Sequence, residues 1–216
     1  IGANEAAVHT LLPLMAQFRA VVPDIAIDVR RVPARQIPVE VQQGSLDFGA
    51  LTFRPTEPDL LSVPVGHDEL VLLVPPTHRF ATRDAVTMAE VADEPVVAHN
   101  DPSPARERVL RLFEEQQIVL QMVIALPSLD VIKRAVELGM GVALLPRRCA
   151  PTELASGRLV AVPVQGISRR RELTLVCRTG HRSHAANAFL AVAQQQASGE
   201  ARTGARRSRR RQNPET

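Results

Sequence analysis

The sequence predicts an α/β protein with two Rossmann-like subdomains and a central cleft. Two observations predict this fold class. Short apolar runs alternate with helical patterns in two successive β-α-β-α-β series. Proline-rich strand ends join the two series. Strand C-termini and helix N-termini meet between such lobes, where they offer unpaired backbone N–H groups. We therefore expect a small ligand there.

The first series covers residues 1–52. Residues 1–3 have the pattern of a strand end, and Asn4 is a good N-cap for the helical pattern that follows. Apolar and charged side chains alternate over residues 25–29, which predicts a second strand. A helix that stops at Gly44 and a strand over residues 46–52 complete the series. This order predicts parallel pairing of the three strands.

Two prolines affect the predicted helices of this series. Pro13 lies inside the first helical pattern, so we expect that helix to be kinked or to restart with the proline in its first turn. Pro38 is expected to interrupt the second helix and make it irregular.

The second series begins after two further predicted strands, at residues 60–65 and 69–74. The second of these is apolar enough to be covered on both faces. Thr87 and Glu90 have the spacing of a capping box, which predicts the start of a short helix. A strand at residues 96–98 follows it.

Two more N-cap signals lie in this series. Ser103 precedes Pro104 and is expected to begin a longer helix, and Ser128 is expected to cap another helix that ends at Gly139. The remaining predicted elements are strands over residues 119–126, 142–145, 159–164 and 173–177 and a last helix over residues 183–196.

The composition is that of an ordinary globular protein, with 216 residues of which 45% are hydrophobic and 23% charged. No apolar stretch reaches the roughly 18 to 20 residues that span a bilayer, and the first residues show neither a basic leader nor a cleavage site. We therefore expect no membrane contact and a cytoplasmic protein. Cys149 and Cys177 belong to no metal-binding or disulfide spacing and are expected to be reduced thiols.

The positive charge is concentrated in a C-terminal tail. Residues 198–216 contain six arginines and two glutamates, a net charge of +4, while the whole chain carries +3. The rest of the chain is therefore close to neutral and has no electrostatic footprint for nucleic acid. A polar tail without apolar residues is expected to be disordered. Nonspecific attraction of this tail to phosphates is the alternative.

Three local patterns suggest chemistry and are better explained without it. Gly139-Met140-Gly141 is a fragment of a dinucleotide fingerprint, but it follows a helix and precedes a strand, so it predicts a turn and no cofactor. His181 and His184 lack a third metal ligand, which favours surface histidines. His99 is accompanied by no nucleophile or paired carboxylates, so it is expected to line the cleft of a protein that is not an enzyme.

Five segments carry a resemblance to a known family. They are residues 1–24, 44–49, 70–78, 89–95 and 138–146, the third reading Leu-Val-Leu-Leu-Val-Pro-Pro-Thr-His and the last Leu-Gly-Met-Gly-Val-Ala-Leu-Leu-Pro. In order and spacing they resemble the effector-binding domain of the LysR-type transcriptional regulators over residues 1–195.

The resemblance implies a type II periplasmic-binding-protein-like fold. Subdomain I would comprise residues 1–74 and 164–197, and subdomain II residues 75–163. It also implies an effector in the cleft, a homodimer, and a tetramer of the full-length protein. Promoter DNA would be bound by an N-terminal winged helix-turn-helix domain that this chain does not contain.

Family members hold the effector largely with polar residues at helix starts, which implies candidate residues here. Asn4 and Ser128 match the capping positions of the two lobes, although Asn4 replaces the usual hydroxyl and Glu5 adds a negative charge. Capping alone would also explain Asn4, Ser103 and Ser128. The candidate effector contacts are Asn4, Glu5, Thr52, His99, Asn100, Ser103, Ser128 and Gly141.

The ligand class and the competing functions follow from this reading. The chain has no Trp and no Tyr, which are the usual platforms for large rings, so a small polar or carboxylate-bearing metabolite is expected. The alternative function is a solute-binding protein of a transport system, which uses the same fold. A helix-turn-helix upstream of residue 1 would indicate the regulator, and a signal peptide the transporter.

Overall fold

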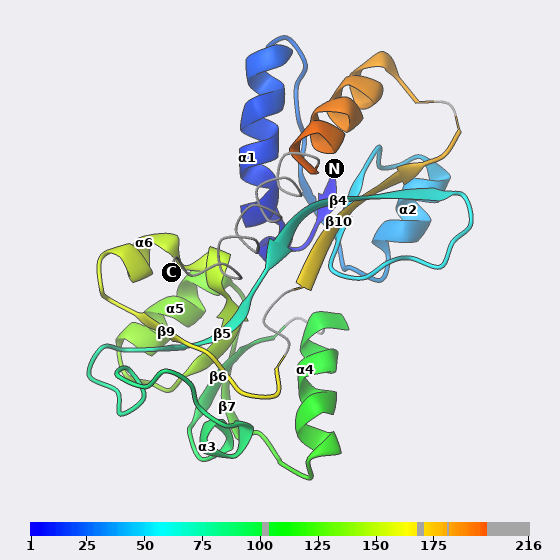
Figure 1. The fold of residues 1–216 in the computed structure, drawn as a ribbon. Helices are drawn as coiled ribbons and strands as arrows, with labels where there is room; N and C mark the ends of the chain where they lie inside the picture. Colours follow the sequence, from blue (N-terminus) through cyan, green and yellow to red (C-terminus); the bar gives the residue numbers. More distant parts are fainter. Residues whose placement is uncertain (101–103, 168–170, 181, 198–216) are drawn as a thin grey trace, which may run out of the picture. The chain divides into compact units, whose positions relative to one another are not determined.

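The computed structural model describes residues 1–100, 104–167, 171–180 and 182–197. The chain forms two compact units (Figure 1). Unit 1 comprises Ile1–His67 and the segment from Glu172 onward, and unit 2 comprises Asp68–Arg171. None of the described helices is both long enough and apolar enough to cross a membrane.

Unit 1 contains a five-stranded sheet in the order β2-β1-β3-β10-β4. As predicted, β1 (Gly2–Ala3) pairs in parallel with β2 (Arg30–Arg31) and β3 (Gly49–Leu51). The later strand β10 (Arg171–Arg178) pairs antiparallel with β3, and β4 (Leu60–Asp68) is its other neighbour. The carboxyl ends of β1, β2 and β3 therefore lie at one edge of the sheet.

In the core of unit 1, helix α1 (Glu5–Val21) packs against this sheet and against the helix over residues 184–197. Phe18 of α1 and Phe48 both contact Phe189 of that last helix, with ring centroids 5.1 and 5.0 Å apart. Pro13 is exposed and α1 continues through it, so the expected restart does not occur. The buried side chains on both sides of Pro13 hold the helix together despite the missing N–H.

Helix α2 (Ile37–Gln43) ends at Gly44 as predicted, with Gly44 in the left-handed conformation at φ +81°. The expectation that Pro38 interrupts this helix is wrong. Pro38 lies in the first turn, where the missing N–H has no partner within the helix in any case.

Unit 2 is built on two small sheets. Strand β5 (Leu70–Val74) lies between β8 (Ala143–Pro146) and β9 (Val160–Val162) and pairs antiparallel with both. All five residues of β5 are buried, as its apolar sequence predicts. Strand β6 (Val96–His99) pairs in parallel with β7 (Met122–Leu126). An isolated parallel bridge between Val96 and Val142 joins β6 to the segment before β8.

The helices of unit 2 include two that begin as the sequence predicts. Helix α3 (Met88–Ala92) has the full capping box of Thr87 and Glu90. Helix α5 (Leu129–Glu137) is capped by Ser128. The others are α4 (Pro104–Glu115), the 3-10 turn η1 (Arg147–Cys149) and α6 (Pro151–Ala155).

The division between the units lies elsewhere than the sequence suggested. Residues 68–74 and 164–171 were expected in the first subdomain, and the structure assigns both to unit 2. The reason is strand pairing, because both hydrogen-bonded partners of β5 are strands of unit 2. An apolar strand sequence does not reveal which strands will pair with it.

Several strands are also shorter than their apolar patterns. The alternating segment over residues 25–29 is partly buried against the core of unit 1 but forms no strand. Strand β2 begins only after it, at Arg30. The predicted strands over residues 46–52 and 119–126 reduce to β3 and β7. Burial of one face accounts for alternation even where no hydrogen-bonded ladder forms.

Candidate functional site

Asn4 joins the end of β1 to the start of α1. Its side-chain Oδ1 accepts a hydrogen bond from the backbone N–H of Ala7 at 2.8 Å. This cap uses the oxygen of the side chain, so a ligand contact from Asn4 would come from its amide nitrogen. Glu5 follows in the first helical turn and is half-buried, with its negative charge at the positive end of the helix dipole.

Thr52 lies at the same edge of the sheet as Asn4. It directly follows β3 and is half-buried. Since Gly2 of β1 is paired with Gly49 of β3 in parallel, the residues that follow the two strands come to the same edge. Unit 1 thus brings together the three candidate residues that the sequence placed in it.

His99 and Asn100 lie at the carboxyl end of β6, beside the carboxyl end of β7. His99 is paired in register with Leu126, and the backbone N–H of Asn100 donates to the Leu126 carbonyl at 2.9 Å. Ser128 follows two residues after Leu126. The parallel pairing therefore collects His99, Asn100 and Ser128 at one edge of unit 2.

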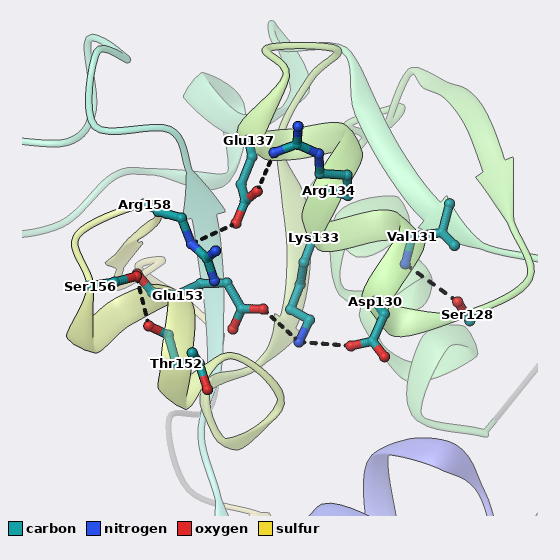
Figure 2. Close-up of polar contacts among 10 residues, drawn as sticks. All are labelled: Ser128, Asp130, Val131, Lys133, Arg134, Glu137, Thr152, Glu153, Ser156 and Arg158. Carbon is teal, nitrogen blue, oxygen red and sulfur yellow. Dashed lines mark hydrogen bonds and ion pairs between the residues drawn. The ribbon is translucent and has the colours of Figure 1, made fainter.

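Ser128 is the N-cap of α5. Its Oγ accepts a hydrogen bond from the backbone N–H of Val131 at 3.3 Å (Figure 2). The hydroxyl hydrogen can still be donated to a ligand while the oxygen caps the helix. Ser128 can thus serve both roles that the sequence suggested for it.

Two candidate residues do not join these groups. Ser103 lies outside the described residues. Gly141 is buried next to Val142, which bridges Val96 at the beginning of β6, whereas His99 ends that strand. A Cβ atom at Gly141 would lie 2.2 Å from the carbonyl oxygen of Pro95. Close packing alone explains this glycine.

Sequence reasoning missed a buried lysine beside this edge of unit 2. The Nζ of Lys133 on α5 lies 2.9 Å from Asp130 Oδ1 and 2.9 Å from Glu153 Oε1 of α6, and its side chain is 7% exposed (Figure 2). Asp130 is three residues away on the same helix, so that pair was predictable from spacing. Glu153 comes from another helix, and no sequence signal joins it to Lys133.

The ion pair shifts the pKa of both partners. Burial acts to lower the pKa of Lys133, but the hydrogen bonds and charges of Asp130 and Glu153 outweigh it and raise the pKa above 10.5. Burial acts to raise the pKa of Glu153, but Lys133 outweighs it and lowers the pKa below 4.5. Both groups are therefore charged at neutral pH and hold α6 on α5.

A second missed residue supports the end of β6. The guanidinium Nη1 of Arg106, on α4, donates to the carbonyl oxygen of His99 at 2.8 Å. This bond fixes the backbone from which His99 and Asn100 project. Arg106 follows its partner by seven residues, a spacing that is typical of no regular contact, so the sequence did not reveal the bond.

The described residues contain no group of three or more His, Cys, Asp or Glu side chains placed to hold a metal ion. His184 lies at the start of the last helix, and His181, the other half of the considered pair, is outside the described residues. Both edges combine a helix N-terminus with polar side chains, and Glu5 and Asp130 add a negative charge in the first turns of α1 and α5. Such groups can bind small polar molecules by hydrogen bonds.

Comparison with known proteins identifies relatives of the whole described chain. The sequence model of the family described as "LysR substrate binding domain" matches residues 1–198. A "Probable RuBisCO transcriptional regulator" of Nostoc sp. is 28% identical over 88% of this chain and 58% of its own length. The "HTH-type transcriptional regulator CbbR" of Rhodospirillum rubrum is 27% identical over 88% of this chain and 63% of its own length. This chain therefore spans about three fifths of such relatives.

Solved structures share the fold. The regulatory domain of Synechocystis CcmR, in complex with 2-PG, superposes with a TM-score of 0.79 at 22% identity and covers 90% of this chain and 94% of its own. The effector binding domain of QuiR, in complex with shikimate, superposes with a TM-score of 0.76 at 21% identity and covers 92% and 95%. At these identities the likeness establishes the fold alone.

Proposed function

This chain belongs to the family of LysR substrate-binding domains, and we propose that it senses a small metabolite for a transcriptional regulator. Its fold is α/β and of the type II periplasmic-binding-protein-like class. The relatives are transcriptional regulators, which are not enzymes. They favour regulation over the transport function that the sequence left as the alternative.

One observation carries the proposal. Each unit gathers the polar residues of its candidate site at the edge where its parallel strands end and where a capped helix begins. Asn4 and Thr52 occupy this edge in unit 1, and Asn100 and Ser128 occupy it in unit 2. A metabolite bound at such an edge would favour one state of the chain over another, and differential affinity of this kind is what a sensor needs.

The proposed ligand is a small polar or carboxylate-bearing metabolite. The N-termini of α1 and α5 offer the positive ends of two helix dipoles together with side chains that can donate hydrogen bonds. Glu5 and Asp130 lie in the first turns of these same helices and oppose a ligand of high negative charge. The complexes of two structural neighbours with 2-PG and with shikimate support a ligand of this size.

The partners of the full-length protein follow from the same proposal. Its remaining part would carry the helix-turn-helix that the names of relatives mention, and would bind promoter DNA in the cytoplasm. We propose a homodimer, assembled into a tetramer in the full-length regulator. Strand β7 supports the dimer, because among the described strands only β6 pairs with it, and its Met122 and Val123 are exposed. An unpaired apolar strand edge is suited to contact a second copy.

A thermal-shift screen tests the sensing proposal. The chain is heated with each member of a panel of small carboxylates and hydroxylated metabolites that includes 2-PG and shikimate. A ligand at a hundred times its Kd stabilises the fold by about 2.7 kcal/mol, which raises Tm by about 5–10 °C for a chain of this size. A panel without any stabilising compound would count against the proposal.

Two capping variants make the screen specific. Ser128→Ala and Thr87→Ala each remove the side-chain cap of a helix, so both lower Tm slightly. Only Ser128→Ala removes a proposed ligand contact. We expect the ligand-induced shift to survive in Thr87→Ala and to shrink in Ser128→Ala, and equal shifts in both variants would contradict the site.

A further inference from the structure

The chain passes between the two units at two places. The first crossing lies between His67 and Asp68, at the end of β4, and the second between Arg171 and Glu172, at the start of β10. These strands are neighbours in one sheet. Any change in the relative position of the units must therefore bend or twist the chain at these two points.

A buried ion pair joins the two crossings. The Nη2 of Arg171 lies 2.8 Å from the Oδ2 of Asp68, and the two side chains are 12% and 7% exposed. The pair connects the last residue of β4 to the first residue of β10, which are 103 positions apart in the sequence. Burial strengthens the attraction because little water screens the two charges.

The pair is only half of the interaction that these two groups can make. A guanidinium and a carboxylate often form two parallel bonds, here Nη2 to Oδ2 and Nε to Oδ1. Asp68 Oδ1 and Arg171 Nε are buried, and neither has a hydrogen-bond partner among the residues that the structure describes. The two atoms left unpaired are the two that would complete the second bond.

We propose that Asp68 and Arg171 form a latch, meaning an ion pair that restrains the two crossings. The pair has one hydrogen bond in the structure and would have two after a small shift of the two strands. The latch sets how readily the two units change their relative position. Given the proposed metabolite-sensing function, on which this consequence rests, it also sets the fraction of molecules ready to bind the metabolite.

The next residue of β10 provides a matched control. Glu172 forms an ion pair with Arg54 at 3.2 Å, and these side chains are 38% and 75% exposed. Successive side chains of a strand point to opposite faces, so this pair lies at the same crossing but in water. It should contribute little restraint, because solvent screens exposed pairs.

Amide hydrogen exchange and small-angle X-ray scattering of the ligand-free chain test the latch. We expect Asp68→Asn to speed exchange of the amides around residues 66–70 and 172–174 at least tenfold and to change the radius of gyration. Amides of α1 and α5 should stay within twofold. The controls Arg54→Gln and Glu172→Gln should match the wild type in both measurements.

Two further variants keep the test decisive. Asp68→Asn combined with Arg171→Gln buries no unpaired charge, so it can fold even where the single variant does not, and it should show the same fast exchange. Arg171→Lys keeps the charge but cannot donate two parallel hydrogen bonds to Asp68, so its amides too should exchange faster. If the double variant shows the exchange rates and scattering of the wild type, the latch is overturned. If Arg171→Lys shows wild-type exchange rates, the proposed state with two hydrogen bonds is overturned. Both readouts are free of ligand, so failure of the latch and failure of metabolite sensing are told apart.

Discussion

Lys133 and Glu153 form a buried ion pair, Nζ to Oε1 at 2.9 Å, that joins α5 to α6. Asp130 binds the same ammonium group from the first turn of α5. The helix that presents Ser128 is therefore held in place by a charge interaction as well as by its apolar face. This relationship makes the stability of the unit 2 edge sensitive to single substitutions.

Replacing Lys133 by Met should destabilise the protein by about 3 kcal/mol, because Glu153 would be left as a buried charge without its partner. Urea unfolding measures this free energy. The neighbouring Arg134→Gln is the control, since Arg134 pairs with Glu137 but is 66% exposed, and it should cost less than about 1 kcal/mol. Equal losses in both variants would show that the buried pair contributes nothing special.

The Lys133–Glu153 pair should also make stability depend on pH. The pKa of Glu153 is lower in the folded state, so its contribution is present above about pH 4.5 and is lost as the pH falls through the folded value. The pKa of Lys133 is raised, so its contribution is lost only as the pH rises beyond 10.5. The stability difference between wild type and Glu153→Gln should stay constant between pH 6 and 9 and shrink below pH 4.5. A difference that grows on acidification would contradict this assignment.

Gly141→Ala should destabilise the protein by about 3 kcal/mol, because the new Cβ would meet the Pro95 carbonyl oxygen and φ is +148°. Gly139→Ala is the matched control. Gly139 also has a positive φ, +75°, but a Cβ there meets nothing within 4 Å, so only the backbone penalty of about 1 kcal/mol remains. Denaturant unfolding measures the free energy of unfolding of both variants. A larger loss in Gly141→Ala would show that close packing requires this glycine, and equal losses would leave only the backbone conformation of a turn.

Asn4→Asp should separate ligand binding from helix capping. Aspartate caps a helix as well as asparagine, so stability should change by less than about 0.5 kcal/mol. The variant lacks the amide donor and should weaken a carboxylate ligand about tenfold, as measured by calorimetry with a compound found in the screen. Unchanged affinity would remove Asn4 from the site.

Val123→Lys should convert the proposed dimer into a monomer, as measured by light scattering during size-exclusion chromatography. A charge on the exposed edge strand β7 opposes pairing with a second copy. Val39→Lys introduces the same charge at a position on α2 that is exposed to a similar degree, 46% against 53%. It should leave the dimer intact. A wild type that is already monomeric would contradict the dimer through this edge.

Much of the local structure could be predicted from short sequence patterns. Asn4, Ser128 and the pair Thr87 and Glu90 cap helices where the spacing of polar and apolar residues places them, and Gly44 ends one. The alternation of strands and helices also predicted the parallel pairing of β1 with β2 and β3 in unit 1. These features depend on residues a few positions apart, so the sequence carries them directly.

The candidate site could be predicted only in part from such short sequence patterns. Asn4, Thr52, Asn100 and Ser128 remain candidates, and the resemblance to the LysR family together with the predicted strand ends and helix starts pointed to them. Gly141 lies apart from them, at the other end of β6. Its contact with Pro95 lies across 46 positions and depends on strand register, which the sequence does not reveal.

The tertiary structure alone decided the contacts that join distant segments. Nothing in the sequence pairs Lys133 with Glu153, Asp68 with Arg171, or β5 with strands of the second unit. Local propensity determines where helices and strands begin, whereas their partners depend on how the whole chain buries its apolar surface. For this protein the sequence determined the elements and the capped helix starts, and packing determined which charges meet and where one unit ends.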